Sequence, residues 1–347
     1  MEEPTIKTTV VGSYPAIDWF LQSPSAQALQ DATAVVLKTQ ELAGMDLVAD
    51  GELYRFDINH PETNGMIDYF VQPLANVRSE VTLADEKKFQ ELEEMEFRAK
   101  PAAVVEGEVG PGMLNLVSDY DGVRALTDRP VKFTITGPHM LSKTLLDHHY
   151  EDRPALARAL AEAMADQVRE IDADVVQFDE ANLAGSPEEA SWAAEALNIL
   201  LDAVPNTPAV HLCFGNYGGQ SIQEGTWEDL IGYMNDLHVD HMVLEFARRG
   251  YDELERFSDL RPSVGIGLGV IDIKTTEVES PEEVARRIEE AAEIVGVDRL
   301  EYVHPDCGFW MLERSITDAK MRALVEGRDL FEGRRTDAAM GETVSAH

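Results

Sequence analysis

The sequence predicts an α/β protein built as a closed (β/α)8, or TIM, barrel. Short apolar runs rich in β-branched residues alternate with longer helical patterns along nearly the whole chain, which is typical of βα units and a parallel sheet. Eight such runs can be counted, and 347 residues suit an eight-stranded barrel with insertions. A doubly wound open sheet is the main alternative, but no G-x-G-x-x-G motif follows the first run.

Each predicted βα unit begins with a strand-like run. The eight predicted strands are Thr8–Val11, Leu47–Ala49, Val131–Thr136, Val175–Phe178, Ala209–Cys213, Met242–Phe246, Val264–Leu268 and Leu300–Val303. The predicted helices between them are Ser25–Ala43, Asp152–Ile171, Pro187–Ala203, Trp227–Leu237 and Pro281–Val295. Two of these helices have clear start signals, because Ser186-Pro187 and Ser280-Pro281 each precede two glutamates. Serine can cap a helix, proline suits its first turn, and acids there favour the helix dipole.

One long insertion separates the second predicted strand from the third. It covers about residues 54–129, is mixed and charged in composition, and contains two candidate extra strands, Val71–Leu83 and Ala102–Val109. We interpret it as an excursion near the barrel mouth, so that residues 1–347 form a single barrel domain with a polar tail from about residue 335. Later in the chain, Gly265, Gly267 and Gly269 alternate along a strand, which indicates close backbone packing.

Charge and cysteine content exclude several functional classes. The chain carries 29 lysines and arginines against 65 aspartates and glutamates, a formal net charge of −36. Such a surface repels nucleic-acid phosphates and anionic membranes, so we expect neither partner. Neither an apolar run of about 18 residues nor a signal-peptide pattern is visible, so we expect a soluble cytoplasmic protein. The acids are dispersed through the sequence, which favours a halophilic surface adapted to high salt.

Polar or metal-binding residues follow nearly every predicted strand. In a (β/α)8 barrel, reactive groups lie at the carboxyl ends of the strands. A purely structural barrel does not require polar residues there, so the sequence predicts an active-site rim. The strand-end residues are Gly12-Ser13, Asp50-Gly51-Glu52, Gly137-Pro138-His139, Asp179-Glu180, His211-Leu212-Cys213, Glu245, Asp272 and His304-Pro305-Asp306-Cys307.

The sharpest of these motifs is His211-Leu212-Cys213. Residues i and i+2 of a strand point to the same face, so both side chains are expected to enter the barrel. The only other cysteine, Cys307, lies just beyond the last strand, and two cysteines cannot form a disulfide framework in so long a chain. With Glu245, the set offers an imidazole, two thiolates and a displaceable carboxylate, which suits Zn²⁺. On spacing alone, the alternative that these are ordinary core residues stays open.

Seven motifs occur in order along the chain: Thr8-Thr9-Val10-Val11-Gly12-Ser13-Tyr14-Pro15, Asp50-Gly51-Glu52, Thr136-Gly137-Pro138, Gln177-Phe178-Asp179-Glu180, His211-Leu212-Cys213, Glu245 and Pro305-Asp306-Cys307-Gly308. This order resembles the catalytic C-terminal barrel of the cobalamin-independent methionine synthase family. The resemblance covers roughly residues 8–330, which is most of the chain.

The resemblance implies a metal site and an amino-acid site. It implies Zn²⁺ bound by four residues: His211, Cys213, Glu245 and Cys307. It also implies that Val11-Gly12-Ser13, Glu52 and Asp179 hold the amino-acid part of homocysteine. A free thiol is mostly protonated at neutral pH and a poor nucleophile, and coordination to zinc deprotonates it. Simpler interpretations are a helix N-cap pair for Asp179-Glu180 and a solvated loop acid for Glu52.

The sequence differs from the long form of that family at the positions that serve the folate donor. It holds no counterpart of the second, N-terminal barrel, and His139 follows Gly137-Pro138 where the long form has a tryptophan. Gly185 stands where a glutamate is expected, and Asp272-Ile273-Lys274 replaces the segment with the catalytic histidine. We therefore take Asp272 and Lys274 as the candidate catalytic residues. We expect a methyl donor other than folate polyglutamate, such as a methylated corrinoid or its carrier protein, as thought for a short archaeal-type form.

Two other functions remain open. The family includes zinc enzymes that alkylate coenzyme M, and the run His211-Leu212-Cys213-Phe214-Gly215-Asn216-Tyr217 is similar to that branch. Glu52 and Asp179 favour an amino-acid thiol, because carboxylates repel the sulfonate of coenzyme M. The remaining alternative is a non-catalytic paralogue with structural zinc, although such sites more often use closed, cysteine-rich ligand sets.

Overall fold

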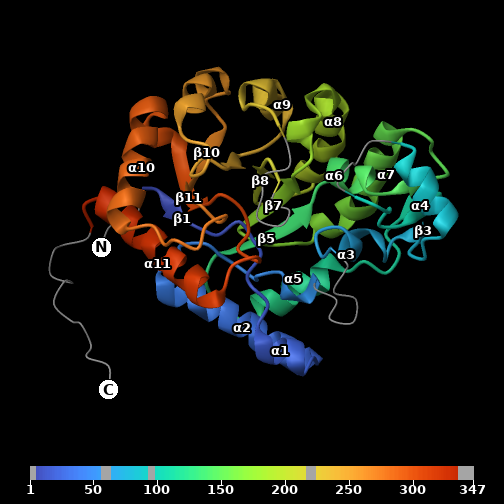
Figure 1. Ribbon diagram of the computed structural model, residues 1–347, viewed down its shortest axis with the longest axis horizontal. Coiled ribbons are helices and arrows are strands. Elements are labelled where there is room, and N and C mark those ends of the chain that lie inside the picture. The colour runs from blue at the N-terminus through green and yellow to red at the C-terminus, as the bar shows by residue number, and fades with distance from the viewer. Residues whose placement is uncertain (1–4, 56–63, 93–97, 216–223, 335–347) are drawn as a thin grey trace.

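Eight parallel strands form the central sheet of the protein (Figure 1). They are β1 (Lys7–Thr8), β2 (Val48–Ala49), β5 (Val131–Thr136), β7 (Val175–Glu180), β8 (Thr207–Leu212), β9 (His241–Leu244), β10 (Gly265–Ile271) and β11 (Leu300–Pro305). The computed structural model describes residues 5–55, 64–92, 98–215 and 224–334. The strand order is β1-β11-β10-β9-β8-β7-β5-β2, and the parallel bridges Thr9–Leu47 and Ser13–Gly51 join its two edges. The sheet therefore closes, and the predicted (β/α)8 barrel is confirmed.

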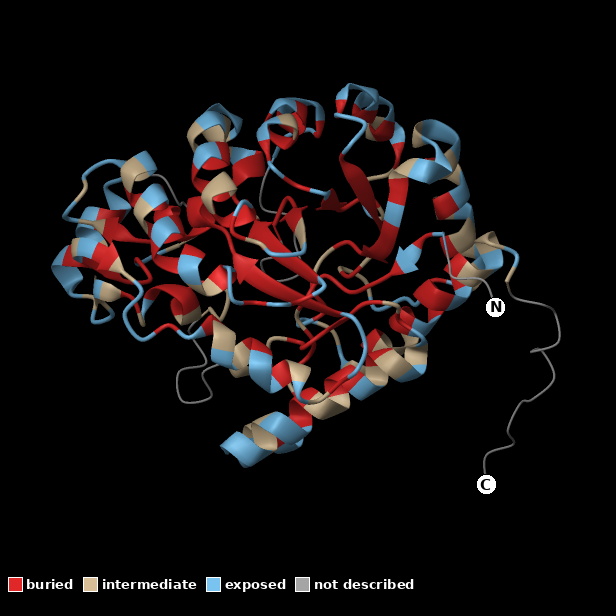
Figure 2. Cartoon of the chain, turned by 180° about the vertical axis from the view of Figure 1, so that it is seen from behind, coloured by how far each residue is buried: buried red, intermediate tan, exposed pale blue. Residues whose placement is uncertain are grey.

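Helices surround this barrel and pack their buried faces against it (Figure 2). They are α1 (Asp18–Gln22), α2 (Ala26–Ala43), α6 (Pro138–Lys143), α7 (Arg153–Val168), α8 (Ala190–Leu201), α9 (Ile231–Asp236), α10 (Pro281–Val295) and α11 (Arg314–Phe331). All five predicted helices are present, and α10 has the predicted bounds. The Ser280 hydroxyl accepts the N–H of Glu283 at 3.1 Å, as its capping signal predicts. Ser186 makes no such bond, and a 3₁₀ turn at Pro187–Glu189 precedes α8 instead.

The insertion builds a small sheet beside the barrel. Its elements are α3 (Asp68–Val71), β3 (Ala75–Arg78), α4 (Leu83–Gln90), β4 (Val104–Gly110) and α5 (Leu116–Arg124), and β3 and β4 form a sheet with β6 (Leu146–Asp147). The candidate strand Ala102–Val109 corresponds to β4, whereas most of Val71–Leu83 is not a strand. A capping box between Thr82 and Asp85 starts α4 there, which ends the extended segment. The predicted polar tail lies outside the described residues.

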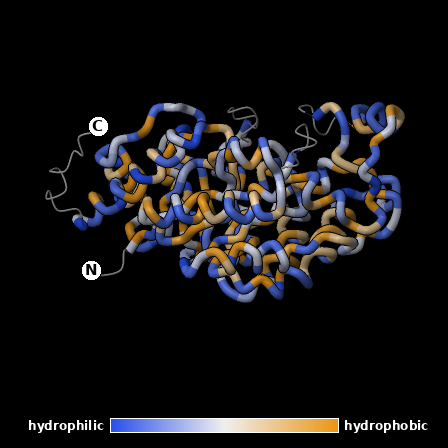
Figure 3. The backbone as a smooth tube through the Cα atoms, turned by 90° about the horizontal axis from the view of Figure 1, so that it is seen from below, coloured by the Kyte–Doolittle hydropathy of each residue, from blue (hydrophilic) through white to orange (hydrophobic). Residues whose placement is uncertain are grey.

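Alternation along the strands separates an outer core from the barrel interior. Outward side chains such as Val176 and Phe178 of β7 join the large core under the helices. Their inward neighbours belong to a small separate cluster: Val11, Leu47, Val175, Ala209, Val243 and Tyr302. Because the period of a strand is two, Gln177 and Asp179 point inward with Val175. Hydrophobic and hydrophilic residues alternate along the peripheral helices, as Figure 3 shows, which is typical of helices that pack one face against a core.

Glycines of β10 allow their neighbours to approach closely, as predicted. A Cβ on Gly267 would lie 2.8 Å from the carbonyl oxygen of Met242 and 3.0 Å from Nε2 of His304. A Cβ on Gly265 would collide with the carboxylate of Glu301. Within the described part of the chain, none of the helices combines the length and apolar character needed to cross a membrane.

A buried ion pair ties α11 to the loop after β10 and should be critical for stability. Lys320 Nζ lies 2.8 Å from Glu279 Oε2 and 2.9 Å from the carbonyl oxygen of Asp272, and the Lys320 side chain is fully buried. We expect Lys320→Met to lower the free energy of unfolding by about 3–5 kcal/mol, because it removes the closer of the two cations that pair with the buried Glu279 carboxylate and leaves Arg287 Nη1 at 3.6 Å. The exposed Lys38, which pairs with the partly buried Glu41, provides the control, and Lys38→Met should change the free energy of unfolding by at most about 1 kcal/mol. Urea unfolding measures both, and equal effects would contradict this assignment.

Candidate metal centre

Three potential metal ligands meet at the carboxyl ends of β8 and β11. His211 lies near the end of β8, Cys213 follows that strand, and Cys307 follows β11. One ligand atom from each residue lies within 4.8 Å of the other two. His211 and Cys213 are buried, both cysteines are free, and Cys307 is partly exposed. The structure thus brings together three of the four predicted metal ligands.

The imidazole of His211 is oriented by the backbone of the neighbouring strand. Its Nδ1–H donates a hydrogen bond to the carbonyl oxygen of Val243 on β9, at 2.9 Å. Its Nε2 is buried and has no hydrogen-bond partner among the described residues. A metal-binding histidine commonly donates its other N–H to a carbonyl in this way. Nε2 is therefore the nitrogen available to a metal.

Hydrogen bonding between the two thiols separates their acidities. The bond from Cys213 lowers the pKa of Cys307 well below the usual range, and His211 acts in the same direction. The same bond, together with burial, raises the pKa of Cys213. Burial opposes protonation of His211, but Cys307, Asp179 and the carbonyl of Val243 together raise the pKa of His211 to about 9. These shifts favour a thiolate at Cys307, and thiolate is the form of cysteine that binds metals.

The fourth predicted ligand, Glu245, lies beside this group rather than within it. Its Oε2 is 3.4 Å from Nζ of Lys274, and both side chains are almost fully buried. Burial raises the pKa of Glu245 above its usual value, and the Lys274 ammonium offsets only part of this rise. Oε1 is buried and has no hydrogen-bond partner among the described residues. One carboxylate oxygen is thus paired, and the other is available to a ligand.

These donors fit Zn²⁺. An imidazole nitrogen and a carboxylate oxygen are buried without hydrogen-bond partners among the residues that the structure describes, and two sulfurs lie beside the imidazole. Leaving such atoms unsatisfied in a protein interior is unfavourable, and a bound cation would satisfy them. Nitrogen, sulfur and carboxylate donors in this proportion are typical of zinc. A zinc ion would be held by His211, Cys213 and Cys307, with Glu245 as the displaceable fourth ligand.

The predicted substrate residues of the first two βα units pack against each other. Gly12 leaves room for Glu52, because a Cβ at position 12 would collide with Glu52 Oε1. The same carboxylate oxygen accepts the Thr134 hydroxyl at 2.6 Å and lies 3.4 Å from Nη1 of Arg55. Glu52 also has a positive φ of 62°, which is uncommon for a residue with a side chain. Glu52 is therefore held in a defined position and is not a solvated loop acid.

Ser13 connects the first strand to the segment that carries Cys307. Its carbonyl oxygen accepts the N–H of Phe309 at 2.9 Å. Its hydroxyl packs so closely on Gly308 that a Cβ there would collide with it. The end of the first strand is therefore adjacent to the candidate metal centre.

Asp179 lies inside the barrel together with a lysine that we did not predict. Its Oδ1 accepts Nε2 of Gln177 at 2.7 Å. Burial and the charge of Glu52 raise the pKa of Asp179 to about 7, against the influence of His211. Burial lowers the pKa of Lys132 to about 7, against the charges of Asp179 and Glu52, and its Nζ donates to the carbonyl of Val10. An inward lysine in the apolar run Val131–Thr136 was the signal that could have identified it.

The two candidate catalytic residues occupy different places. Lys274 reaches Glu245, as described above. Asp272 lies at the rim, where its Oδ2 is 3.3 Å from Nη1 of Arg248. Its Oδ1 accepts the backbone N–H of Lys274 at 2.8 Å. The structure therefore places Asp272 as a support for the Lys274 loop and does not bring its carboxylate into the metal group.

Glu180 binds the start of α6 from the end of strand β7, and it is not an N-cap residue as the simpler interpretation expected, because Gly137 is the N-cap of α6. Its two oxygens accept the backbone N–H groups of His139 at 3.0 Å and Met140 at 2.9 Å, at the start of α6. Burial raises the pKa of Glu180 to about 8, against those two hydrogen bonds. Nearby, His139 Nε2 and Lys143 Nζ each lie 2.8 Å from Oε2 of Glu189. Glu180 thus anchors α6, while Asp179 points into the barrel.

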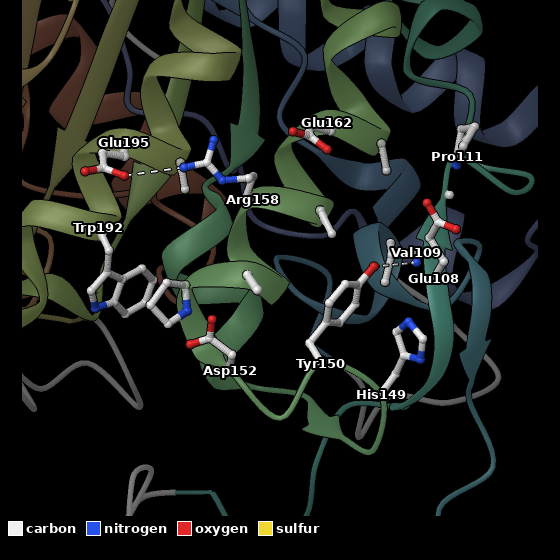
Figure 4. A pocket seen from close by; sticks show the side chains of 16 residues that line it. Glu108, Val109, Pro111, His149, Tyr150, Asp152, Arg158, Glu162, Trp192 and Glu195 are labelled. Carbon is white, nitrogen blue, oxygen red and sulfur yellow. Dashed lines mark hydrogen bonds and ion pairs between the residues drawn. The ribbon is translucent and has the colours of Figure 1, made fainter.

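A separate groove lies between the small sheet and helices α7 and α8 (Figure 4). Its volume is about 680 Å³. The Tyr150 hydroxyl accepts the backbone N–H of Val109 at 2.9 Å, and Arg158 of α7 forms an ion pair with Glu195 of α8. None of the predicted site residues lines this groove.

A (β/α)8 barrel whose mouth gathers two thiols, an imidazole and buried carboxylates belongs to the class of barrels with a donor set suited to a metal at the carboxyl ends of the strands. Within that class, residues 6–328 match the family described as "Cobalamin-independent synthase, Catalytic domain". The chain belongs to this family, and it is a methyltransferase of the methionine synthase type.

Relatives and solved structures agree with this assignment. The chain is 29% identical to a protein named methionine synthase from Thermococcus kodakarensis, over 99% of this chain and 98% of the relative. It is 30% identical to 2-hydroxypropyl-CoM lyase from Xanthobacter autotrophicus, over 94% and 95%. The structure of a B12-independent methionine synthase from Shewanella sp. W3-18-1 superposes with a TM-score of 0.79 at 23% identity, over 95% of this chain and 98% of that one. That structure supports the barrel fold.

Glu180 should make stability depend on pH. Its pKa of about 8 in the folded state exceeds the value of about 4.5 expected on unfolding, so the folded state holds an extra proton between these values. We expect the wild type to lose free energy of unfolding, relative to Glu180→Gln, as the pH rises from about 5 to about 8. Urea unfolding at several pH values measures this, with the exposed Glu195→Gln as the charge-matched control. Parallel pH profiles for wild type and Glu180→Gln would contradict the shift.

Proposed function

We propose that this protein transfers a methyl group to the thiol of homocysteine to form methionine, at a zinc ion held by His211, Cys213, Glu245 and Cys307. The observation that carries the proposal is the convergence of unpartnered ligand atoms beside buried carboxylates at the barrel mouth. Zinc, when bound there, would supply the positive charge that favours the thiolate form of the acceptor. The family membership supports an enzyme and disfavours a non-catalytic paralogue.

The residues around the centre suit an amino-acid thiol. Glu52 and Asp179 can accept hydrogen bonds from the ammonium group of homocysteine. The pKa of Asp179, raised by burial to about 7, leaves part of this group protonated near neutral pH, and a bound ammonium would favour its charged form. Backbone N–H groups at Gly12 and Ser13 are the proposed partners of the substrate carboxylate, because strand ends can offer such donors. These acids and amides would orient the acceptor.

Coenzyme M is the second candidate acceptor. It is favoured by the likeness to a relative named 2-hydroxypropyl-CoM lyase. Against it, Glu52 and Asp179 would repel a sulfonate at the position proposed for the ammonium group. Two residues of the run that is similar to the coenzyme M branch, Asn216 and Tyr217, lie outside the described residues. The choice between acceptors therefore depends on the buried acids.

For the methyl donor we propose a methylated corrinoid or its carrier protein. The position of the long form's catalytic histidine is near Lys274, whose amine pairs with Glu245. Lys274 would hold the Glu245 carboxylate in place beside a zinc ion bound at this centre. Asp272 supports Lys274 through its backbone N–H. We propose that these two residues serve the metal centre and that neither binds a folate.

Removing one metal ligand should abolish zinc binding and turnover together. We expect His211→Ala and Cys307→Ser to lose stoichiometric zinc and at least about 100-fold in methyl transfer, since even changes beside a metal ligand cost 10–100-fold. His238→Ala, at an exposed histidine, is the matched control and should keep both. Zinc content by atomic absorption and methionine formation are the measurements. Full activity in zinc-free protein would refute the proposed centre.

Competition assays should identify both substrates. With methylcobalamin as the donor, we expect homocysteine to be methylated and coenzyme M to compete weakly, because the acids repel its sulfonate. Glu52→Gln should raise the KM for homocysteine by about tenfold, the equivalent of one charge-assisted hydrogen bond of roughly 1.5 kcal/mol. Efficient turnover of methyltetrahydrofolate would refute the proposed donor. Preference for coenzyme M would refute the proposed acceptor.

A further inference from the structure

The carboxylate of Asp306 connects two segments that carry proposed metal ligands. It is 1% exposed and accepts the backbone N–H groups of three consecutive residues. Its Oδ1 accepts from Phe246 at 2.9 Å and from Ala247 at 2.8 Å, and its Oδ2 accepts from Arg248 at 2.9 Å. Its own backbone N–H donates to the carbonyl of Ile271 at 2.9 Å. Asp306 is therefore held firmly at both its side chain and its main chain.

These contacts join the neighbours of two ligands on strands that are not adjacent. Phe246 directly follows Glu245 at the end of β9, and Asp306 directly precedes Cys307 at the end of β11. In the barrel, β10 lies between β9 and β11. The hydrogen bonds of Asp306 therefore cross over β10 and link the backbone beside Glu245 to the backbone beside Cys307.

Gly269 of β10 makes this crossing possible. A Cβ on Gly269 would collide with Oδ1 of Asp306. It would also lie 2.8 Å from the carbonyl oxygen of Leu244 and 3.0 Å from the backbone nitrogen of Phe246. Any side chain here would push the Asp306 carboxylate away from the three N–H groups. The last glycine of the alternating set is therefore explained by the Asp306 carboxylate above it.

We propose that Asp306, seated on Gly269, is a positioning residue that sets the spacing between Glu245 and Cys307 in the metal centre. The proposal deepens the proposed function and rests on its zinc site. Asp306 does not point to the ligand group itself, because both of its oxygens are used by the loop after Glu245. Its effect on the metal is exerted through the two backbone segments that it joins.

A carboxylate is required here for a simple reason of hydrogen bonding. Both oxygens of aspartate accept, which matches the three donors of the loop. Asparagine of the same shape keeps one accepting oxygen but turns an NH₂ donor toward one of the N–H groups. Asp306→Asn therefore loses at least one bond and adds a donor–donor contact, with little change in volume. Gly269→Ala leaves the carboxylate intact and displaces it.

The test compares zinc binding in Asp306→Asn, Gly269→Ala and a matched control. Glu180→Gln is the control, because Glu180 is also a buried carboxylate that accepts backbone N–H groups, but its partners begin α6 and carry no proposed ligand. Zinc affinity is measured by competition with a chromophoric chelator. The absorption spectrum of the cobalt(II)-substituted protein reports the coordination geometry. The melting temperature of the metal-free protein reports stability.

We expect both variants to bind zinc about 10–100-fold more weakly than the wild type, as is typical when a residue that orients metal ligands is changed. Their cobalt spectra should also change. Glu180→Gln should keep the wild-type cobalt spectrum and a zinc affinity within about twofold of the wild-type value. Wild-type zinc affinity and cobalt spectrum in either folded variant would overturn the proposal, even if its melting temperature falls. Should Asp306→Asn not fold, Gly269→Ala decides the question. Absence of zinc binding by the wild type would instead refute the proposed function.

Discussion

Unsatisfied ligand atoms buried at the barrel mouth are the constraint on which the other features of this structure depend. Nε2 of His211 and Oε1 of Glu245 lie in the interior with no hydrogen-bond partner in the part of the chain that the structure describes, and two sulfurs lie close by. Burying such groups is unfavourable unless something compensates them. The backbone around them is correspondingly well held, through the carbonyl of Val243 and the carboxylate of Asp306. The fold thus keeps donor atoms in place for a cation.

Charge is distributed very differently inside and outside the barrel. The whole chain has a formal net charge of −36, and solvent and salt screen those charges that are exposed. Inside, a few ionisable groups lie close together at low dielectric, so that burial shifts the pKa values of Asp179 and Lys132 to about 7 from opposite sides. Groups whose pKa values lie near neutrality can exchange protons with a substrate at small free-energy cost. The net charge therefore describes the solvent-facing shell, and the chemistry depends on the interior.

The fold was largely predictable because its signals are local. β-branched runs predict strands and proline-serine pairs predict helix starts, and α10 begins and ends at the predicted residues. Prediction was less accurate where side chains serve distant partners. Ser186 does not cap α8, and Glu189 turns instead toward His139 and Lys143. These contacts join helices that are separated by dozens of residues, and no local pattern specifies them.

The sequence by itself determined the barrel and the donor set, because the period of a strand already points His211 and Cys213 the same way and strand order places Cys307 at the same end. Only the tertiary structure decided which groups meet. In the tertiary structure, Lys274 pairs with Glu245, and Asp272 pairs with Arg248 outside the group of metal ligands. Lys132 lies near Asp179 inside the barrel. The tertiary structure also places Asp306 across β10, above Gly269. Such contacts depend on barrel closure and on the register of neighbouring strands, which are properties of the whole sheet and not of any one segment.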